Sequence, residues 1–187
     1  MMQSLYTAST GMLSMQTQID TTANNIANVN TIGFKKSRAE FADLMYKVME
    51  YAGTSTSDVS KSPTGIEVGL GSRPTAINKI FSEGSLKQTD NQLDIAVTGR
   101  GFFKLELPDG TEVYSRNGAF KIDADGIVVN SEGYKLVPEV VIPPDATNVS
   151  IGTDGTVTVV QTGQTQATQI GQLSLTNFVN PAGLHSM

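Results

Sequence analysis

Residues 5–33 read LYTASTGMLSMQTQIDTTANNIANVNTIG. Side chains at alternating spacings of three and four form a stripe that is apolar at all but one position. Its members are Leu5, Ala8, Met12, Met15, Ile19, Thr22, Ile26 and Val29. Such a stripe, kept over about four heptads, is typical of a helix that packs against other helices. We therefore expect an N-terminal axial helix segment over residues 1–35, with a helix of about 30 residues, about 45 Å long, that stops at Gly33.

The face opposite this stripe is polar but uncharged, with Asp20 as the only charged residue before Lys35. Neutral amides and hydroxyls suit a face that is packed against neighbours, because burying ions there would cost several kcal/mol. The alternative is a long amphipathic helix lying on its own β domain. Because asparagine is a poor helix former, we expect residues 1–33 to be frayed in the isolated chain and ordered by contact with other copies.

Residues 36–92 are expected to connect this helix to a second domain. Phe41, Leu44, Met45 and Val48 lie at the spacing of a helix, within a mixed stretch at 37–49. Residues 52–62 are rich in Ser, Thr and Gly, which predicts a linker. Short strands are expected at 66–68 and 75–81, around a turn at 69–74.

From residue 93 to residue 187 the pattern has period two, beginning with Leu93, Ile95 and Val97. Turn signals such as Pro108–Asp109–Gly110 then recur at hairpin spacing. Strands are expected at 119–123, 127–130, 134–137, 149–151, 156–160 and 172–179. The predicted class is α+β, a long N-terminal coiled-coil-type helix followed by an all-β antiparallel domain of many short strands.

Composition excludes several functions. The 187 residues carry a net charge of −5, so no basic field attracts nucleic acid or anionic lipid. With no cysteine and a single histidine, His185, the chain offers little for a zinc site or a thiol nucleophile. It also has no apolar run of about 18 residues, so we expect no membrane insertion. Residues 1–13 lack the features of a cleavable signal peptide, and we expect export by another route.

Catalytic motifs are weak. Asp123–Ala124–Asp125–Gly126 fails the calcium-loop spacing, since Ile127 and Val128 stand where an oxygen donor and a glycine are needed. Gly99–Arg100–Gly101 is followed by a strand pattern instead of the helix of a phosphate loop. A carboxylate pair for glycoside hydrolysis stays open, because sequence does not give distances in space. We expect a non-enzymatic protein without catalytic residues, cofactor or metal.

Two longer motifs carry a resemblance. Residues 23–35, ANNIANVNTIGFK, and 93–103, LDIAVTGRGFF, resemble two signatures of bacterial flagellar rod and hook proteins. Residues 41–51 and 62–74 are most similar to the distal rod proteins of that family. The resemblance implies that the N-terminal helix pairs with a C-terminal helix in the inner tube of a helical filament. The β domain would form the next shell, and the segment between them would pack between subunits.

The resemblance also implies type III export without a cleaved signal and a periplasm-spanning place in the basal body. Partners would be other copies, proximal rod and hook subunits, and surrounding ring proteins. Because no C-terminal helix follows the last strand pattern, we expect a C-terminally truncated chain. The expected self-assembly interface consists of Leu5, Met12, Met15, Ile19, Asn24, Asn25, Ile26, Asn28, Val29, Gly33 and Phe34. The alternatives are a hook or proximal rod subunit and, from another class, a peptidoglycan- or glycan-binding β module.

Overall fold

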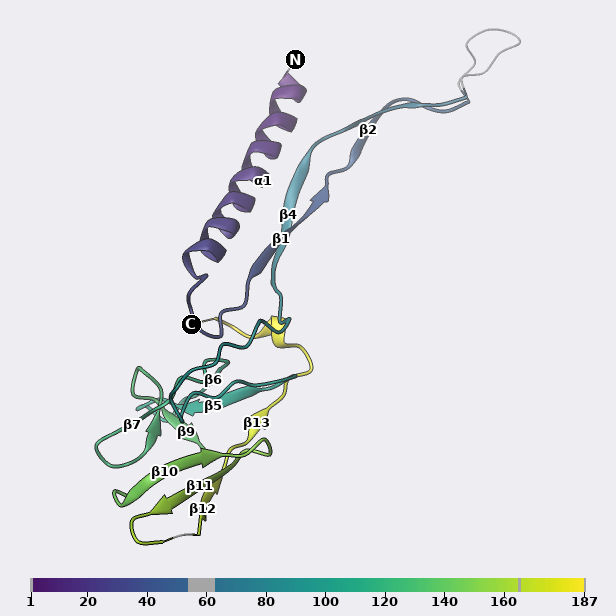
Figure 1. The fold of residues 1–187 in the computed structure, drawn as a ribbon. Coiled ribbons are helices and arrows are strands. Elements are labelled where there is room, and N and C mark those ends of the chain that lie inside the picture. The colour runs from purple at the N-terminus through teal and green to yellow at the C-terminus, as the bar shows by residue number, and fades with distance from the viewer. Residues whose placement is uncertain (1, 54–62, 165, 187) are drawn as a thin grey trace, which may run out of the picture. The chain divides into compact units, whose positions relative to one another are not determined.

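The computed structural model describes residues 2–53, 63–164 and 166–186. It divides into two compact units, the first made of Met1–Val29 with Lys35–Ile80 and the second of Asn30–Phe34 with Phe81–Met187. The first unit holds a helix and a β ribbon, and the second holds short antiparallel strands (Figure 1). The predicted α+β class is confirmed. Residues 54–62 of the expected linker lie outside the described residues.

Helix α1 spans Met2–Ala27, so the helix ends before the stop predicted at Gly33. Asparagines lie at its end. The backbone N–H of Asn28 donates to the Asn24 oxygen at 3.1 Å, as in a helix, and the Asn28 side-chain amide donates to the same oxygen at 3.0 Å. The next amide, on Val29, reaches back only to Ile26, at 3.2 Å, which tightens the chain into a turn.

The remainder of the first unit is an antiparallel β ribbon. Strand β1 (Ser37–Asp43) pairs with β4 (Ser72–Lys79), with a bulge between Glu40 and Phe41. Strand β2 (Tyr46–Glu50) pairs with β3 (Ile66–Gly69) and continues the same arm (Figure 1). The helical spacing noted at 37–49 is therefore misleading. Pairing with residues 66–79 supplies the backbone hydrogen bonds that hold this stretch extended, whatever the spacing of its apolar residues.

The second unit contains two sheets. One is ordered β13-β5-β9-β8-β7, with β6 also paired to β5, and the other is ordered β10-β11-β12. The strands are β5 (Phe102–Glu106), β6 (Glu112–Ser115), β7 (Lys121–Ile122), β8 (Val128–Val129), β9 (Lys135–Val137), β10 (Ala146–Ile151), β11 (Thr156–Gln161), β12 (Thr168–Gln172) and β13 (Leu175–Thr176), followed by a 3₁₀ turn, η1 (Pro181–Gly183). The strand predicted at 172–179 is broken, because the chain leaves β12 at Gln172 and pairs anew with β5.

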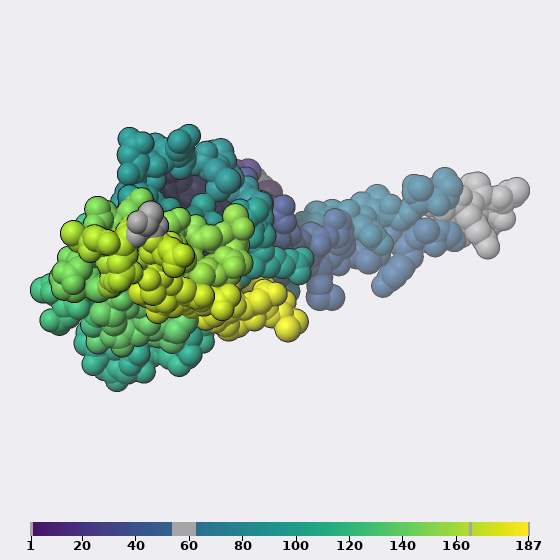
Figure 2. Space-filling view, turned by 60° about the horizontal axis from the view of Figure 1, so that its bottom comes forward, coloured from purple at the N-terminus to yellow at the C-terminus, as the bar shows by residue number. Residues whose placement is uncertain are grey.

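The core of the second unit is apolar and well packed. Phe103 and Phe120 meet edge to face, with ring centroids 5.1 Å apart, and both are almost fully buried. The segment 93–97 is not a strand, although Leu93 is buried and Ile95 donates its backbone N–H to Gly118 at 2.9 Å. Near the C-terminus, Phe178 packs edge to face on Phe102, with ring centroids 5.7 Å apart. Figure 2 shows the C-terminal segment, in yellow, at the surface beside the green residues of the same unit.

Candidate assembly surface

The apolar stripe of α1 faces solvent. By this name we mean Leu5, Met12, Met15, Ile19 and Ile26 on the helix with Val29 just beyond its end, whose exposed fractions lie between 65% and 75%. In a protein that packs alone, a helix turns its apolar side chains toward the core. Here these side chains are not part of a core, and exposed apolar surfaces of this kind are typical of protein interaction sites.

The opposite side of α1 contacts the ribbon through small polar residues. We call this contact the polar seam, and it joins α1 to β1, β4 and the glycine before β4. Ser14 and Thr21 are buried in it, at 7% and 8% exposure. The seam consists of Thr10, Ser14, Thr21 and Asn25 on α1 with Ser37, Ala39, Gly71 and Ser72 on the ribbon. Small side chains at the contact let the helix approach the two strands closely.

Hydrogen bonds cross the seam at both ends. The hydroxyl oxygens of Ser14 and Ser72 lie 3.0 Å apart, and the Ser72 backbone N–H donates to Thr10 Oγ1 at 3.4 Å. At the other end, Asn25 Nδ2 donates to the Ser37 carbonyl at 2.8 Å, and the Ser37 N–H donates back to Asn25 Oδ1 at 2.8 Å. The seam is therefore held by polar pairing with little help from apolar burial.

Threonine can be buried in this seam at low cost. Thr21 Oγ1 donates to the Thr17 carbonyl one turn back, at 2.8 Å, and Thr10 Oγ1 does the same to Thr7. These bonds satisfy the hydroxyl within the helix, so that the ribbon need not provide a partner for it.

Gly71 permits the close approach at the start of β4. Its φ is +115°, and a Cβ added there would collide with Thr10 Oγ1. Any other residue at position 71 would have to push the helix away from the ribbon as well as adopt an unfavourable backbone conformation.

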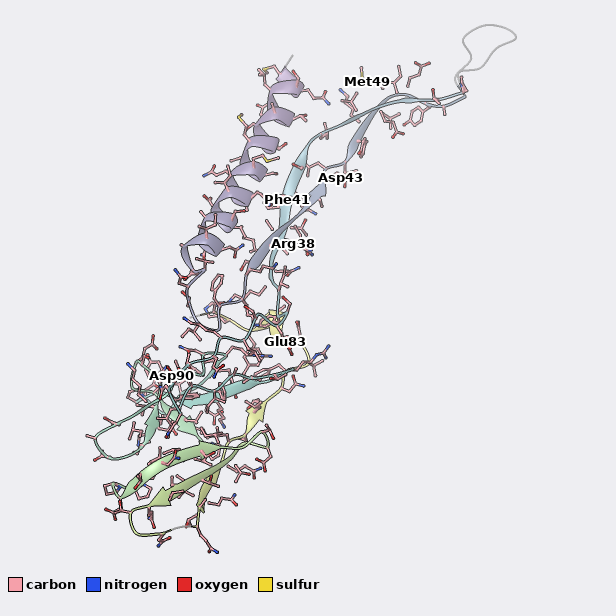
Figure 3. The ribbon with its side chains drawn as sticks, viewed as in Figure 1. Arg38, Phe41, Asp43, Met49, Glu83 and Asp90 are labelled. Carbon is pink, nitrogen blue, oxygen red and sulfur yellow. The ribbon has the colours of Figure 1, made fainter. Side chains whose placement is uncertain are left out.

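The exposed ribbon carries both charged and apolar side chains. Arg38 and Glu40 form a surface ion pair at 3.0 Å, and their hydrogen bond lowers the pKa of Glu40 below its usual value. Pairs this exposed contribute little stability. Phe41 and Asp43 follow on β1, and Met49 lies on β2 (Figure 3). The pairing of ribbon residues is thus secured mainly by the backbone ladder.

The other residues expected at the interface lie near the end of α1. Asn28 Nδ2 bonds to Asn24 Oδ1 at 2.9 Å, so these two amides support one another locally. Gly33 has a φ of +76°, and a Cβ there would meet the backbone of Arg116 and Asn117 at 2.8 Å. Phe34 is half-buried and donates its N–H to Thr31 at 3.3 Å. Gly33 and Phe34 thus belong to the second unit.

Sequence reasoning placed the apolar residues of the stripe on one helix, but it did not predict the polar seam. Thr10, Ser14, Thr21 and Asn25 recur every three to four residues, which is a readable helical signal. The sequence does not reveal that a ribbon of the same chain covers that row. Among residues 2–53, 63–164 and 166–186, no three His, Cys, Asp or Glu side chains gather as a metal site would require. No helix of that described part is long and apolar enough to cross a membrane.

Comparisons with known proteins agree with one another. Residues 5–35 match the family described as flagella basal body rod protein, and residues 96–159 match the flagellar hook protein FlgE/F/G D1 domain. The chain is 38% identical over 135 residues to the flagellar hook protein FlgE of Helicobacter mustelae, covering 72% of this chain and 30% of that protein.

Similarity to rod proteins extends over the whole chain. This chain is 47% identical over 187 residues to the flagellar basal-body rod protein FlgG of Buchnera aphidicola subsp. Schizaphis graminum, and the match covers 100% of this chain and 72% of the relative. For the FlgG proteins of Borreliella burgdorferi and Bacillus subtilis the identities are 41% and 40%, covering 100% and 98% of this chain and 71% and 70% of those proteins. The chain therefore belongs to the FlgG family of flagellar basal-body rod proteins.

Proposed function

We propose that this chain is a structural subunit of the distal rod, and that its copies polymerise through the apolar stripe into the helical drive shaft that transmits torque to the hook. The observation that carries this proposal is the orientation of α1, whose apolar side chains are exposed while its other side contacts β1 and β4. Membership of the rod-protein family supports the rod as the place of assembly, and the orientation of α1 supports the apolar stripe as the contact surface.

The energetics of the first unit favour assembly. Among its described residues, Ala39 is the only hydrophobic side chain that is buried. A helix and a two-stranded ribbon with so small a core are marginal in water, because burial of apolar surface must offset the entropy of ordering the chain. Each stripe side chain that becomes buried against a neighbour would contribute about 1.5–3 kcal/mol. Assembly thus supplies the core that the free unit lacks.

The geometry suits a contact that repeats. The polar seam occupies one side of α1, so the stripe on the other side remains available to helices of other copies. If the stripe of one copy binds a different surface of the next copy, the contact repeats without closing and gives an open helical array. Neutral side chains around the helix avoid buried ions within such an array.

The expected interface residues take different parts in this proposal. The six stripe residues would bury one another between copies. Asn24 and Asn28 would present their paired amides to neighbouring helices. Asn25, whose amide is held by Ser37, would instead fix the angle between α1 and the ribbon. Gly33 and Phe34 would set the connection to the second unit.

We further propose that the chain contacts proximal rod subunits at one end of the shaft, hook subunits at the other and ring proteins around it. It would reach this place in the periplasm through the flagellar type III channel. The match to a hook protein covers only 30% of that relative, against about 70% for the FlgG proteins, which favours the rod over the hook.

An assembly experiment tests the stripe. Ile19→Asp in the full chain should abolish filaments seen by electron microscopy, since a carboxylate would be buried in an apolar contact. Ile19→Leu should assemble, and so should Ile122→Asp, which places the same charge on the exposed β7 strand. Circular dichroism of the Ile19→Asp variant should retain the β signal. Normal filaments from Ile19→Asp would refute the proposal.

A further inference from the structure

The methionines among the described residues all lie in the first unit and are exposed. Met2, Met12, Met15, Met45 and Met49 all belong to the first unit, and their exposed fractions range from 66% to 83%. Methionine is ordinarily among the most buried residues. The core of the second unit is built instead from Phe, Leu, Ile and Val. Since the chain contains no cysteine and no tryptophan, thioethers are its most readily oxidised side chains.

Two of these methionines lie on the apolar stripe. Met12 and Met15 stand between Leu5 and Ile19 at helical spacing, all exposed on the same side of α1. As thioethers they are flexible and apolar, and they adapt to irregular packing against neighbouring helices. As sulfoxides they would carry a strong hydrogen-bond acceptor. The aliphatic neighbours on the stripe have no donor to offer it, so the oxygen would be buried without a partner.

We propose that Met12 and Met15 are a redox-sensitive modification site, at which oxidation of the free subunit blocks its incorporation and assembly protects the sulfur. The inference rests on the proposed function, because it requires that the stripe be buried between copies. The oxidant is a hydroperoxide such as hydrogen peroxide. The sulfur lone pair attacks one peroxide oxygen, the O–O bond breaks and a sulfur–oxygen bond forms. The thioether loses two electrons, and the remaining oxygen leaves as water.

The modification is reversible in principle. A thiol-dependent methionine sulfoxide reductase removes the oxygen as water and restores the thioether, with one enzyme needed for each sulfoxide epimer. An oxidised subunit would therefore be held back without being lost, whereas Met12 and Met15 within an assembled shaft would be shielded by their neighbours.

The experiment uses the full chain and hydrogen peroxide, with sulfoxide at each methionine quantified by mass spectrometry. We expect oxidation to raise the minimum protein concentration for filament formation at least about tenfold. Treatment with both reductase types should return it to its starting value. The variant Met12→Leu/Met15→Leu should assemble equally before and after peroxide, because leucine keeps the volume and the helix preference. The matched control Met45→Leu/Met49→Leu should stay peroxide-sensitive.

Three results would overturn the inference. The first is unchanged assembly of the wild-type chain with Met12 and Met15 fully oxidised. The second is peroxide sensitivity that disappears with Met45 and Met49 instead. Within filaments, Met12 and Met15 should oxidise at least about tenfold more slowly than in the free subunit, and equal rates would likewise overturn it. The untreated Ile19→Asp variant distinguishes failure of this inference from failure of the proposed function. It would form filaments only if the proposed function were wrong.

Discussion

Asn25 and Ser37 are joined by a reciprocal pair of hydrogen bonds, each 2.8 Å long, that link the last turn of α1 to the first residue of β1. The asparagine side chain thereby offers both its donor and its acceptor to one residue of the ribbon, as a neighbouring strand would. This pair fixes where the helix ends relative to the ribbon, and with it the direction in which the apolar stripe points.

Asn25→Ala should loosen the helix from the ribbon. Losing two hydrogen bonds costs about 1–3 kcal/mol, so the Ser37 amide should exchange with solvent deuterium about tenfold faster or more. Asn25→Asp keeps the acceptor and should retain part of the protection, although its carboxylate then faces the Ser37 carbonyl. Gln16→Ala, at an exposed position of α1, serves as the control. Unchanged exchange of Ser37 in the alanine variant would show that this pair does not hold the seam.

Stability should be divided unequally between the two units. Phe120 is 1% exposed and packs on Phe103, so Phe120→Ala should cost about 3–5 kcal/mol of unfolding free energy. Phe41 on the ribbon is 38% exposed, and Phe41→Ala should cost less than about 1 kcal/mol. Urea unfolding followed by circular dichroism measures both values. Similar losses from the two substitutions would mean that the ribbon carries a core of its own.

The sequence predicted the elements that depend on residues close to them in the chain. The three-and-four spacing from Leu5 to Val29 is a property of one helix, and α1 covers all but the end of it. Turn signals such as Asp154–Gly155 lie between strands that pair with each other, here β10 and β11, and such strands were predicted with small errors at their ends. Local chemistry decides both cases, and local chemistry is visible in a sequence.

Elements that depend on distant partners were not predictable in this way. Strand β1 pairs with β4 across the intervening residues 44–71, and Phe41, Leu44 and Val48 gave no hint of that pairing. The polar seam was not predicted for a related reason, since small polar residues are compatible with either exposure to solvent or close packing. The three-part division at residues 35 and 92 stays a prediction, and so does fraying of residues 1–33 in the isolated chain.

The ion pair between strands β5 and β6 should be visible in titration. Lys104 Nζ lies 2.6 Å from Glu112 Oε1, and this contact lowers the pKa of Glu112 and raises that of Lys104. The contribution of Glu112 to stability is present above the ordinary glutamate pKa of about 4.3 and is lost as pH falls through the lowered folded value. That of Lys104 is present below about 10.4 and is lost as pH rises through the raised folded value. Both effects are small because the pair is exposed to solvent.

Replacing the lysine isolates this effect. Lys104→Met should raise the pKa of Glu112 toward its ordinary value, as followed by NMR of the side-chain carboxyl. Glu40 is the internal control, because its lowered pKa depends on Arg38 and should not change. If Glu112 titrates at the same pH in both proteins, Lys104 is not the cause of its shift.

A covalent link across the polar seam tests whether α1 and the ribbon stay together in the assembled rod. Because Ser14 Oγ and Ser72 Oγ lie 3.0 Å apart and the chain has no cysteine, Ser14→Cys/Ser72→Cys should form an intramolecular disulfide on mild oxidation. The control Thr22→Cys/Ser72→Cys places its helix thiol on an exposed position and should remain reduced in the monomer. Loss of free thiols without a change in mass measured by light scattering reports the link.

The linked protein should still polymerise, since the disulfide lies on the side of α1 away from the apolar stripe. Its minimum concentration for filament formation should match that of the same variant under reducing conditions, within about a factor of three. Assembly only after reduction would mean that α1 must leave the ribbon to reach its neighbours, and that the polar seam belongs to the free subunit alone. Equal assembly in both states would identify helix and ribbon as one preformed unit, added to the shaft with its stripe already exposed.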